Sequence, residues 1–183
     1  EIDIRYHKNE LILHHDPFHH HEKNLLSLKD FLENWTYHGP LILNLKSEGI
    51  EEKCIKLMKY FNVRNWFFLD MSMPFFVKYS NLTNNKNFHD FNSSNLAVRF
   101  SDFEPIEYAL SFNGKVSWVW VDTFKDLPLS MSKYKMLKKY NFKICLVSPE
   151  LQGFEKDEIV IMRSKLSNMS IDAVCTKYPE LWS

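Results

Sequence analysis

The chain is poor in glycine, and this excludes the common nucleotide-binding designs. Its 183 residues include four glycines, and neither a Gly-x-Gly-x-x-Gly turn nor a Walker-type loop occurs. Both motifs need glycine where the backbone approaches a phosphate closely. An excess of charge of one sign is also missing, because 23 Lys and Arg balance 23 Asp and Glu. Without a basic field, binding to nucleic acid is not expected, and anion binding must depend on local groups.

Cysteine and long apolar runs are scarce as well. Cys54, Cys145 and Cys175 are an odd set without Cys-x-x-Cys spacing, which argues against a zinc site and predicts reduced thiols in a cytoplasmic protein. The apolar runs are too short to span a bilayer, and no signal peptide is visible. With 45% apolar residues the composition is globular, and the length predicts one domain, residues 1–183, with a real core.

The hydrophobic pattern alternates between strands and helices along the chain. Units of roughly 20 to 30 residues, with strands that are apolar on both faces, indicate parallel βαβ units. The predicted strands cover residues 1–5, 41–46, 66–69, 96–100, 116–121, 142–147 and 171–175, with an extended arm over 11–16. The predicted helices cover residues 27–35, 51–61, 75–82, 105–112, 130–140 and 155–166, and residues 81–95 are predicted to form a surface loop.

This order of elements predicts a TIM (β/α)₈ barrel rather than an open sheet. Nearly every predicted strand ends in a polar residue, and the active sites of parallel α/β folds gather at these carboxyl ends. Seven parallel strands and the arm leave the barrel one βα unit short of eight. The chain also begins at Glu1, without methionine and already inside a strand. We therefore expect the native polypeptide to begin upstream, with the missing unit.

The beginning of the chain carries the residues best suited to chemistry. By strand alternation, Glu1, Asp3 and Arg5 share one face, and the arm that follows ends in His15 and Asp16. Carboxylate oxygens suit hard divalent cations, and imidazole suits proton transfer near neutral pH. The plainer alternative is the solvated face of an antiparallel sheet, which this segment alone fits about equally well.

Four segments together resemble the glycerophosphodiester phosphodiesterase family, part of the wider group of phosphatidylinositol-phospholipase-C-like barrels. They are Glu1-x-Asp3, His15-Asp16, Leu43-Asn44-Leu45-Lys46 and residues 171–179. The resemblance covers nearly the whole chain and is sharpest in the first two segments. It implies a barrel that hydrolyses a glycerophosphodiester-like or polyol- or sugar-phosphate diester.

The same resemblance implies roles for the matching residues. Glu1 and Asp3 match two ligands of a divalent cation, Mg²⁺ or Ca²⁺. His15 matches one of two histidines that act as general acid and base. The other histidine of the family belongs to a His-Arg pair on a first strand that this sequence does not include.

The metal site departs from the family pattern at one position. Asn44 stands where the family has a third acid, so it is the third expected ligand. Its carbonyl oxygen can still face a hard cation, but one negative charge is lost. Two alternatives stay open at this point, weaker metal binding or replacement by a neighbouring carboxylate such as Asp70 or Asp122.

Three further residues are candidates for substrate binding. Lys46, at the end of its strand, would contact a phosphate oxygen, with a pair to a neighbouring acid as the alternative. Arg99 lies in an apolar strand and needs a partner, either the substrate phosphate or Glu104 or Asp70. Trp120, near a strand end, would form the wall of a ligand pocket, with core packing as the alternative.

The remaining histidines of this region are expected to be structural or solvated. His14 alternates to the opposite side of the arm from His15, which predicts a structural place. His19, His20 and His21 cannot all face one site, so a solvated loop is favoured over a metal cluster.

The sequence therefore predicts an enzyme, a metal-dependent phosphoric diester hydrolase with a small-molecule substrate and no transmembrane segment. Two alternatives remain. Asn44, which stands where the family has an acid, suggests a non-catalytic barrel that binds a phosphorylated sugar or polyol. A third hypothesis is an accessory domain of a larger surface-polysaccharide enzyme.

Overall fold

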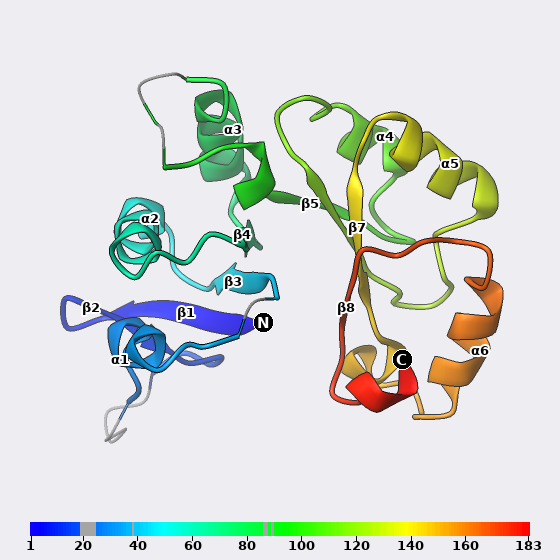
Figure 1. The fold of residues 1–183 in the computed structure, drawn as a ribbon, viewed down its shortest axis with the longest axis horizontal. Helices are drawn as coiled ribbons and strands as arrows, with labels where there is room; N and C mark the ends of the chain where they lie inside the picture. Colours follow the sequence, from blue (N-terminus) through cyan, green and yellow to red (C-terminus); the bar gives the residue numbers. More distant parts are fainter. Residues whose placement is uncertain (19–24, 38, 86–87, 89) are drawn as a thin grey trace. The chain divides into compact units, whose positions relative to one another are not determined.

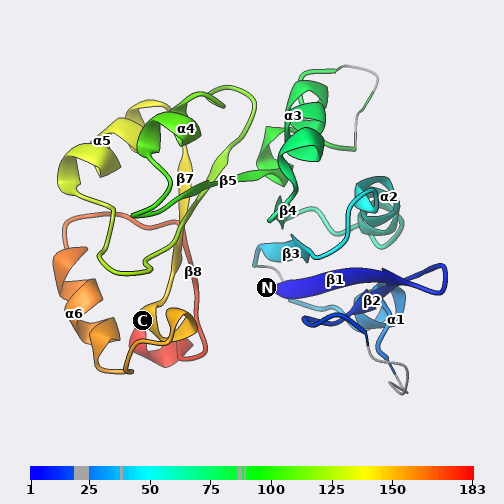
Figure 2. The same ribbon diagram turned by 180° about the vertical axis from the view of Figure 1, so that it is seen from behind.

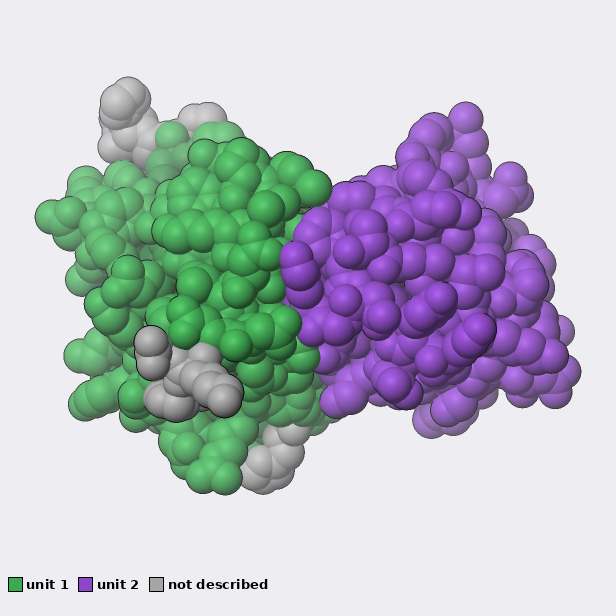
Figure 3. Space-filling model, turned by 90° about the horizontal axis from the view of Figure 1, so that it is seen from above, with its two compact units in different colours: residues 1–96 green, residues 97–183 purple. Residues whose placement is uncertain are grey.

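The computed structural model describes residues 1–18, 25–37, 39–85, 88 and 90–183. The chain forms two units, residues 1–96 and residues 97–183, which Figure 3 distinguishes by colour. Each unit contains one four-stranded sheet. The α/β class expected from the sequence is confirmed, whereas the single barrel domain over residues 1–183 stays a prediction.

The first unit is built on a sheet with the strand order β2-β1-β3-β4. β1 (Ile2–His7) pairs antiparallel with β2 (Glu10–Leu13) and parallel with β3 (Leu41–Leu45), and β3 pairs parallel with β4 (Trp66–Leu69). Lys8 and Asn9 form the turn between β1 and β2 and both have positive φ. Asparagine tolerates this conformation better than most residues, which explains its place in the turn.

Three helices belong to the first unit: α1 (Leu28–Glu33), α2 (Glu51–Tyr60) and α3 (Met73–Leu82), followed by the 3₁₀ turn η1 (Ser93–Asn95). Ser27 caps α1, because its Oγ accepts a hydrogen bond from Asp30 N at 3.0 Å, as the capping pattern of the sequence predicts. α1 lies beside β2 (Figure 1).

The second unit is built on a wholly parallel sheet with the order β5-β6-β7-β8. Its strands are β5 (Ala97–Phe100), β6 (Trp118–Val121), β7 (Lys143–Val147) and β8 (Ala173–Cys175). Helices flank this sheet (Figures 1 and 2): α4 (Ile106–Leu110), α5 (Met131–Lys139) and α6 (Glu158–Lys165), with the 3₁₀ turns η2 (Pro149–Gln152) and η3 (Pro179–Leu181). This is the βαβ pattern that the sequence predicts.

β3, β4 and β6 are buried on both faces, whereas β1 and β8 are largely half-buried. Every residue of β3, β4 and β6 is buried, and Phe67, Phe68, Val119 and Val121 are 0% exposed. A sheet covered by helices requires such strands. In the described part of the chain, no helix combines the length and the apolar character that crossing a membrane requires.

Candidate active site

The amino-terminal part of β1 lies in register with the polar carboxyl end of β3. Asp3 is the pairing partner of Asn44, and Asn44 pairs in turn with Leu69, the last residue of β4. Lys46 continues the pairing beyond β3, because its backbone N–H donates to Ile4 O at 2.9 Å. The parallel strands therefore bring Asp3, Asn44 and the residues that follow β3 and β4 to one edge of the sheet.

Asn44 is 6% exposed and joins the two strands through its side chain. Its Nδ2 donates a hydrogen bond to Glu1 Oε1 at 2.7 Å. Its Oδ1 is buried and accepts no hydrogen bond from any residue that the structure describes. A buried polar atom left in this state costs roughly 1–3 kcal/mol. A cation or a donor supplied by a ligand would remove that penalty.

Asp3 has a second buried oxygen of this kind. Its Oδ1 accepts no hydrogen bond within the described chain, although the Lys46 Nζ lies 3.5 Å away. The same ammonium lies 3.7 Å from Asp70 Oδ2. Both separations are those of ion pairs and are too long for good hydrogen bonds. Lys46 thus offsets negative charge at this edge without satisfying the Asp3 oxygen.

Asp70 directly follows β4 and adopts a left-handed backbone conformation with φ 57. This conformation is uncommon outside glycine, and aspartate is among the residues that tolerate it. It turns the chain at the carboxyl end of β4, where the carboxylate reaches Lys46. Asp70, one of the two carboxylates that the sequence offered as a replacement for the acid missing at position 44, therefore lies at the same edge, whereas the other, Asp122, belongs to the second unit.

The oxygen atoms at this edge fit a hard divalent cation in kind, with one acid fewer than the family pattern. Glu1, Asp3 and Asn44 contribute two carboxylates and an amide, and the two oxygens without hydrogen-bond donors belong to Asp3 and Asn44. Among the described residues, no group of three or more His, Cys, Asp and Glu is placed to hold a metal ion. The three consecutive histidines, residues 19–21, lie outside the described residues.

β2 ends at Leu13, so the arm predicted over 11–16 is a strand only in its first half. His15 lies beyond it, with a side chain that is 71% exposed and an Nδ1 that is 2.8 Å from Asp16 Oδ1. The hydrogen bond from His15, and then its charge, lower the pKa of the Asp16 carboxyl. Within the described residues, no contact joins the His15 ring to Glu1 or Asp3.

His14 fixes the chain just before this exposed pair. Its backbone N–H donates to Asp3 O at 3.0 Å. Its ring Nδ1 lies 2.7 Å from Asp16 O, and the ring stacks on Phe18 with 5.1 Å between centroids. These contacts are those of a residue that shapes the segment, which is the place expected for His14.

Arg99 and Trp120 belong to the second unit and share one buried carboxylate. Asp122 directly follows β6 and is 1% exposed. It accepts hydrogen bonds from Trp120 Nε1 at 2.9 Å, from Gln152 Nε2 at 2.7 Å and from Arg99 Nη1. Trp120 is itself 5% exposed, so its indole is a core group with its N–H on Asp122.

The sequence left the partner of Arg99 open between a substrate phosphate, Glu104 and Asp70, and the structure supplies Asp122. The physical reason is the strand register. Arg99 pairs with a residue of β6 two positions before Asp122, so the guanidinium and the carboxylate meet at the carboxyl ends of neighbouring strands. Glu104 accepts a hydrogen bond from Ser101 Oγ at 2.8 Å.

Sequence reasoning missed Glu150, which ties the carboxyl ends of β7 and β8 together. Its carboxylate accepts hydrogen bonds from Ser148 Oγ, from Thr176 Oγ1 at 2.7 Å and from Lys177 N at 2.9 Å. Burial opposes ionisation here, but these hydrogen bonds outweigh it and lower the pKa of the Glu150 carboxyl. The one available signal was the place of Glu150 just after a predicted strand.

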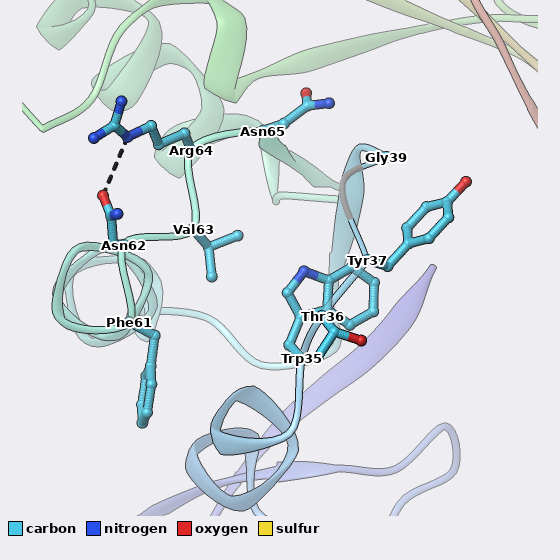
Figure 4. Close-up of a pocket in the computed structure, with 9 residues that line it drawn as sticks. All are labelled: Trp35, Thr36, Tyr37, Gly39, Phe61, Asn62, Val63, Arg64 and Asn65. Carbon is cyan, nitrogen blue, oxygen red and sulfur yellow. Dashed lines mark hydrogen bonds between the residues drawn. The ribbon is translucent and has the colours of Figure 1, made fainter.

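A cleft of about 350 Å³ lies at the opposite edge of the first sheet, where Leu41 N bonds to Asn65 O at 2.9 Å. In Figure 4, Trp35 and Tyr37 line one side, and residues 61–65 line the other. None of the residues predicted to act in catalysis or binding lines this cleft.

No protein-family model and no curated protein matches the sequence. The resemblance to glycerophosphodiester phosphodiesterases therefore depends on the motif residues themselves. Glu1, Asp3, Asn44 and Lys46 are gathered at one edge of the first sheet, and His15 lies at the surface just beyond β2.

Proposed function

We propose that this protein is a metal-dependent phosphoric diester hydrolase that acts on a glycerophosphodiester-like or polyol- or sugar-phosphate diester. We further propose that β1 and β3 to β8 are parallel strands of a TIM (β/α)₈ barrel in the cytoplasm. A parallel bridge between Phe68 of β4 and Leu96, the residue before β5, supports the continued strand order. The odd number of cysteines, with Cys54, Cys145 and Cys175 all present as free thiols, supports the cytoplasmic location.

One observation carries the proposal. Asp3 and Asn44 are pairing partners on parallel strands, and each has a buried oxygen without a donor from the described residues. Two such oxygens on paired residues are costly to bury, and the Lys46 ammonium, 3.5 Å from Asp3 Oδ1, offsets the charge of only one of them. A bound cation accounts for both, and the carboxyl edge of a parallel sheet is where α/β enzymes place such sites.

Glu1, Asp3 and Asn44 are the residues that would hold Mg²⁺ or Ca²⁺. When bound, the cation supplies Lewis-acid chemistry that polarises the phosphodiester and offsets charge on its oxygens. Asn44 Nδ2 orients the Glu1 carboxylate through its 2.7 Å hydrogen bond. Its two side-chain atoms thus serve two purposes, one toward Glu1 and one toward the ligand.

Lys46 and His15 would act on the substrate directly. Because the Lys46 ammonium makes long ion pairs, of 3.5 and 3.7 Å, with the described residues, its N–H groups remain able to donate to a phosphate oxygen. The exposed His15 ring is open to a substrate, and its Nδ1 pairs with Asp16. That pairing leaves Nε2 to move a proton to or from the reacting oxygen, and the Asp16 carboxylate stabilises the protonated ring.

Arg99 is the proposed substrate-binding residue of the second unit, whereas Trp120, 5% exposed, takes the core place that was its alternative. The Arg99 side chain is 27% exposed, and Asp122 holds its guanidinium in place. The indole of Trp120 is fixed by the same carboxylate. A planar guanidinium held in this way suits the geometry of a phosphate.

The test is hydrolysis of glycerophosphodiesters and of bis(p-nitrophenyl) phosphate, with Mg²⁺ or Ca²⁺ and then with a chelator. We expect turnover that needs the cation and that is abolished in Asp3→Ala and in His15→Ala. The exposed pair Lys29 and Glu33 offers a control, since Lys29→Ala leaves the site untouched. Turnover that survives chelation or survives both site variants overturns the assignment.

A non-catalytic barrel that binds a phosphorylated sugar or polyol, or an accessory domain of a surface-polysaccharide enzyme, is the alternative. The amide of Asn44 favours it, because one of its atoms is already used by Glu1 and no third acid is present at that position. Saturable binding of a sugar phosphate without hydrolysis of any diester, measured by calorimetry, would support this alternative.

A further inference from the structure

Arg5 links two segments that carry residues of the proposed site. Its Nε and Nη2 both donate to the carbonyl oxygen of His15, at 3.1 and 2.8 Å. Its Nη1 donates to the carbonyl oxygen of Lys46 at 3.2 Å. One guanidinium thus contacts the chain just after β2 and just after β3, on either side of β1.

The strand pattern explains why Arg5 can reach both carbonyl groups. Arg5 pairs with Ile12 of β2 on one side. On the other side its neighbour Ile4 accepts the hydrogen bond from Lys46 N, so Lys46 lies level with Arg5. A residue at this position of the central strand is therefore flanked by the two segments that carry His15 and Lys46.

The segment after β2 has few other attachments. The last backbone hydrogen bond between β1 and this segment is the one from His14 N to Asp3 O at 3.0 Å. Beyond it, the hydrogen bonds of His15 within the described chain are those from Arg5 and the one between its ring and Asp16. Without Arg5, the His15 backbone would lose its hydrogen bonds to the sheet, and the segment would be held by His14 before it and by the contact between the rings of Phe18 and His7, with 4.3 Å between centroids, after it.

We propose that Arg5 is a positioning residue, which fixes His15 and Lys46 relative to each other by binding both backbones. The functional part of this inference rests on the proposed phosphodiesterase activity. Arginine is needed because its planar group presents N–H donors on three nitrogen atoms in a fixed fork, whereas all three N–H groups of a lysine ammonium lie on a single nitrogen atom. The charge of Arg5 also favours the ionised form of the Asp16 carboxyl, after the larger effects of His15 and His14.

The test compares Arg5→Lys and Arg5→Gln with Arg64→Lys, a control at the opposite edge where the arginine Nε donates to Asn62 Oδ1. Amide hydrogen exchange gives a readout that does not depend on activity. Exchange at His14 N should become about tenfold faster in both Arg5 variants, the factor for losing one charge-assisted hydrogen bond. Exchange in β4 should stay unchanged, which shows that the unit is still folded.

The kinetic readout is the turnover of a diester at saturating substrate. Arg5→Lys, which keeps the charge, should lower kcat by about ten- to a hundredfold with a smaller change in KM, because a misplaced catalytic group affects the chemical step. The proposal is overturned if His14 N in the Arg5 variants exchanges at the wild-type rate. It is also overturned if the kcat of Arg5→Lys equals that of Arg64→Lys. If the wild-type protein has no turnover, the proposed function fails. The exchange rate at His14 N then still tests whether Arg5 holds the segment that carries His15.

Discussion

Asp3 of β1 and Asn44 of β3 are pairing partners, and each keeps a buried side-chain oxygen that accepts no hydrogen bond from the described residues. Buried polar atoms in this state are few in folded proteins, and the proposed cation site accounts for this pair on adjacent strands. A substitution at either position should therefore alter the binding of a cation.

The substitution Asn44→Asp introduces the acid that glycerophosphodiester phosphodiesterases have at the position that Asn44 resembles. We expect it to tighten Ca²⁺ or Mg²⁺ binding by about tenfold, since it adds a charge to the ligand set. Without the cation the variant should be less stable than the wild type, because the introduced carboxylate would face Glu1 without the amide donor. Calorimetric titration and thermal unfolding measure the two effects. Equal cation affinity in both proteins contradicts a metal site here.

The carboxylate of Asp122 should contribute strongly to the stability of the second unit. Asp122→Ala leaves Trp120 Nε1, Gln152 Nε2 and Arg99 without their shared acceptor. We expect a loss of about 3 kcal/mol in the free energy of unfolding, the scale for breaking a buried pair. Urea unfolding measures it, with Lys29→Ala as an exposed control expected within about 0.5 kcal/mol of wild type. A loss no larger than that of the control would be inconsistent with a buried network.

The gathering of Glu1, Asp3 and Asn44 at one edge could be anticipated from the sequence, because strand alternation and parallel pairing are local patterns. The α/β class followed from the same periodicity. By contrast, the contacts of Arg5 depend on the path of the chain after β2 has ended, and no periodicity describes that path. The exposed place of His15 was missed for the same reason, since the strand stops at Leu13.

The acceptor of Arg99 shows a second limit of sequence reasoning. An arginine in an apolar strand predicts that a partner exists, but it does not say which acid it is. That depends on the register of β5 against β6, which a sequence of short apolar strands leaves undefined. Glu150 is a similar case, because its three donors come from two separate segments.

The buried carboxyl of Glu51 should make stability depend on pH. Glu51, at the start of α2, is 2% exposed, and burial is the main cause that raises the pKa of its carboxyl above the ordinary 4.5. The folded state then holds the proton more tightly than the unfolded state. The stability that the protonated Glu51 carboxyl contributes is therefore fully present below pH 4.5 and is lost as the pH rises through the raised pKa.

The Glu51→Gln variant should remove this loss, so its stability relative to wild type is highest at neutral pH. The neighbouring Glu52→Gln is a control of opposite sign, because the hydrogen bond from Lys56 lowers the pKa of the Glu52 carboxyl. Urea unfolding between about pH 4 and pH 7, the range in which a raised carboxyl pKa acts, measures both variants. If Glu51→Gln and wild type have parallel pH profiles, the carboxyl is not buried as described.

The three cysteines should differ in reactivity. Cys54 and Cys145 are 0% exposed, and burial raises the pKa of both thiols, whereas Cys175 is half-buried. Since the thiolate is the reactive form, we expect one thiol to react quickly with Ellman's reagent in the folded protein and all three after denaturation. Cys175→Ser should abolish the fast phase. A fast phase that persists in this variant shows that one of the other two is accessible.

The most direct test of the cation site is a titration of the protein with Ca²⁺ or Mg²⁺ followed by ¹H–¹⁵N NMR at the side-chain amide of Asn44. This group reports on both Glu1 and the buried Oδ1. We expect its resonances to shift saturably in the wild-type protein and to stay unchanged in Asp3→Ala. Shifts confined to exposed acidic residues, with the Asn44 amide unaffected at saturation, would contradict the proposed metal site.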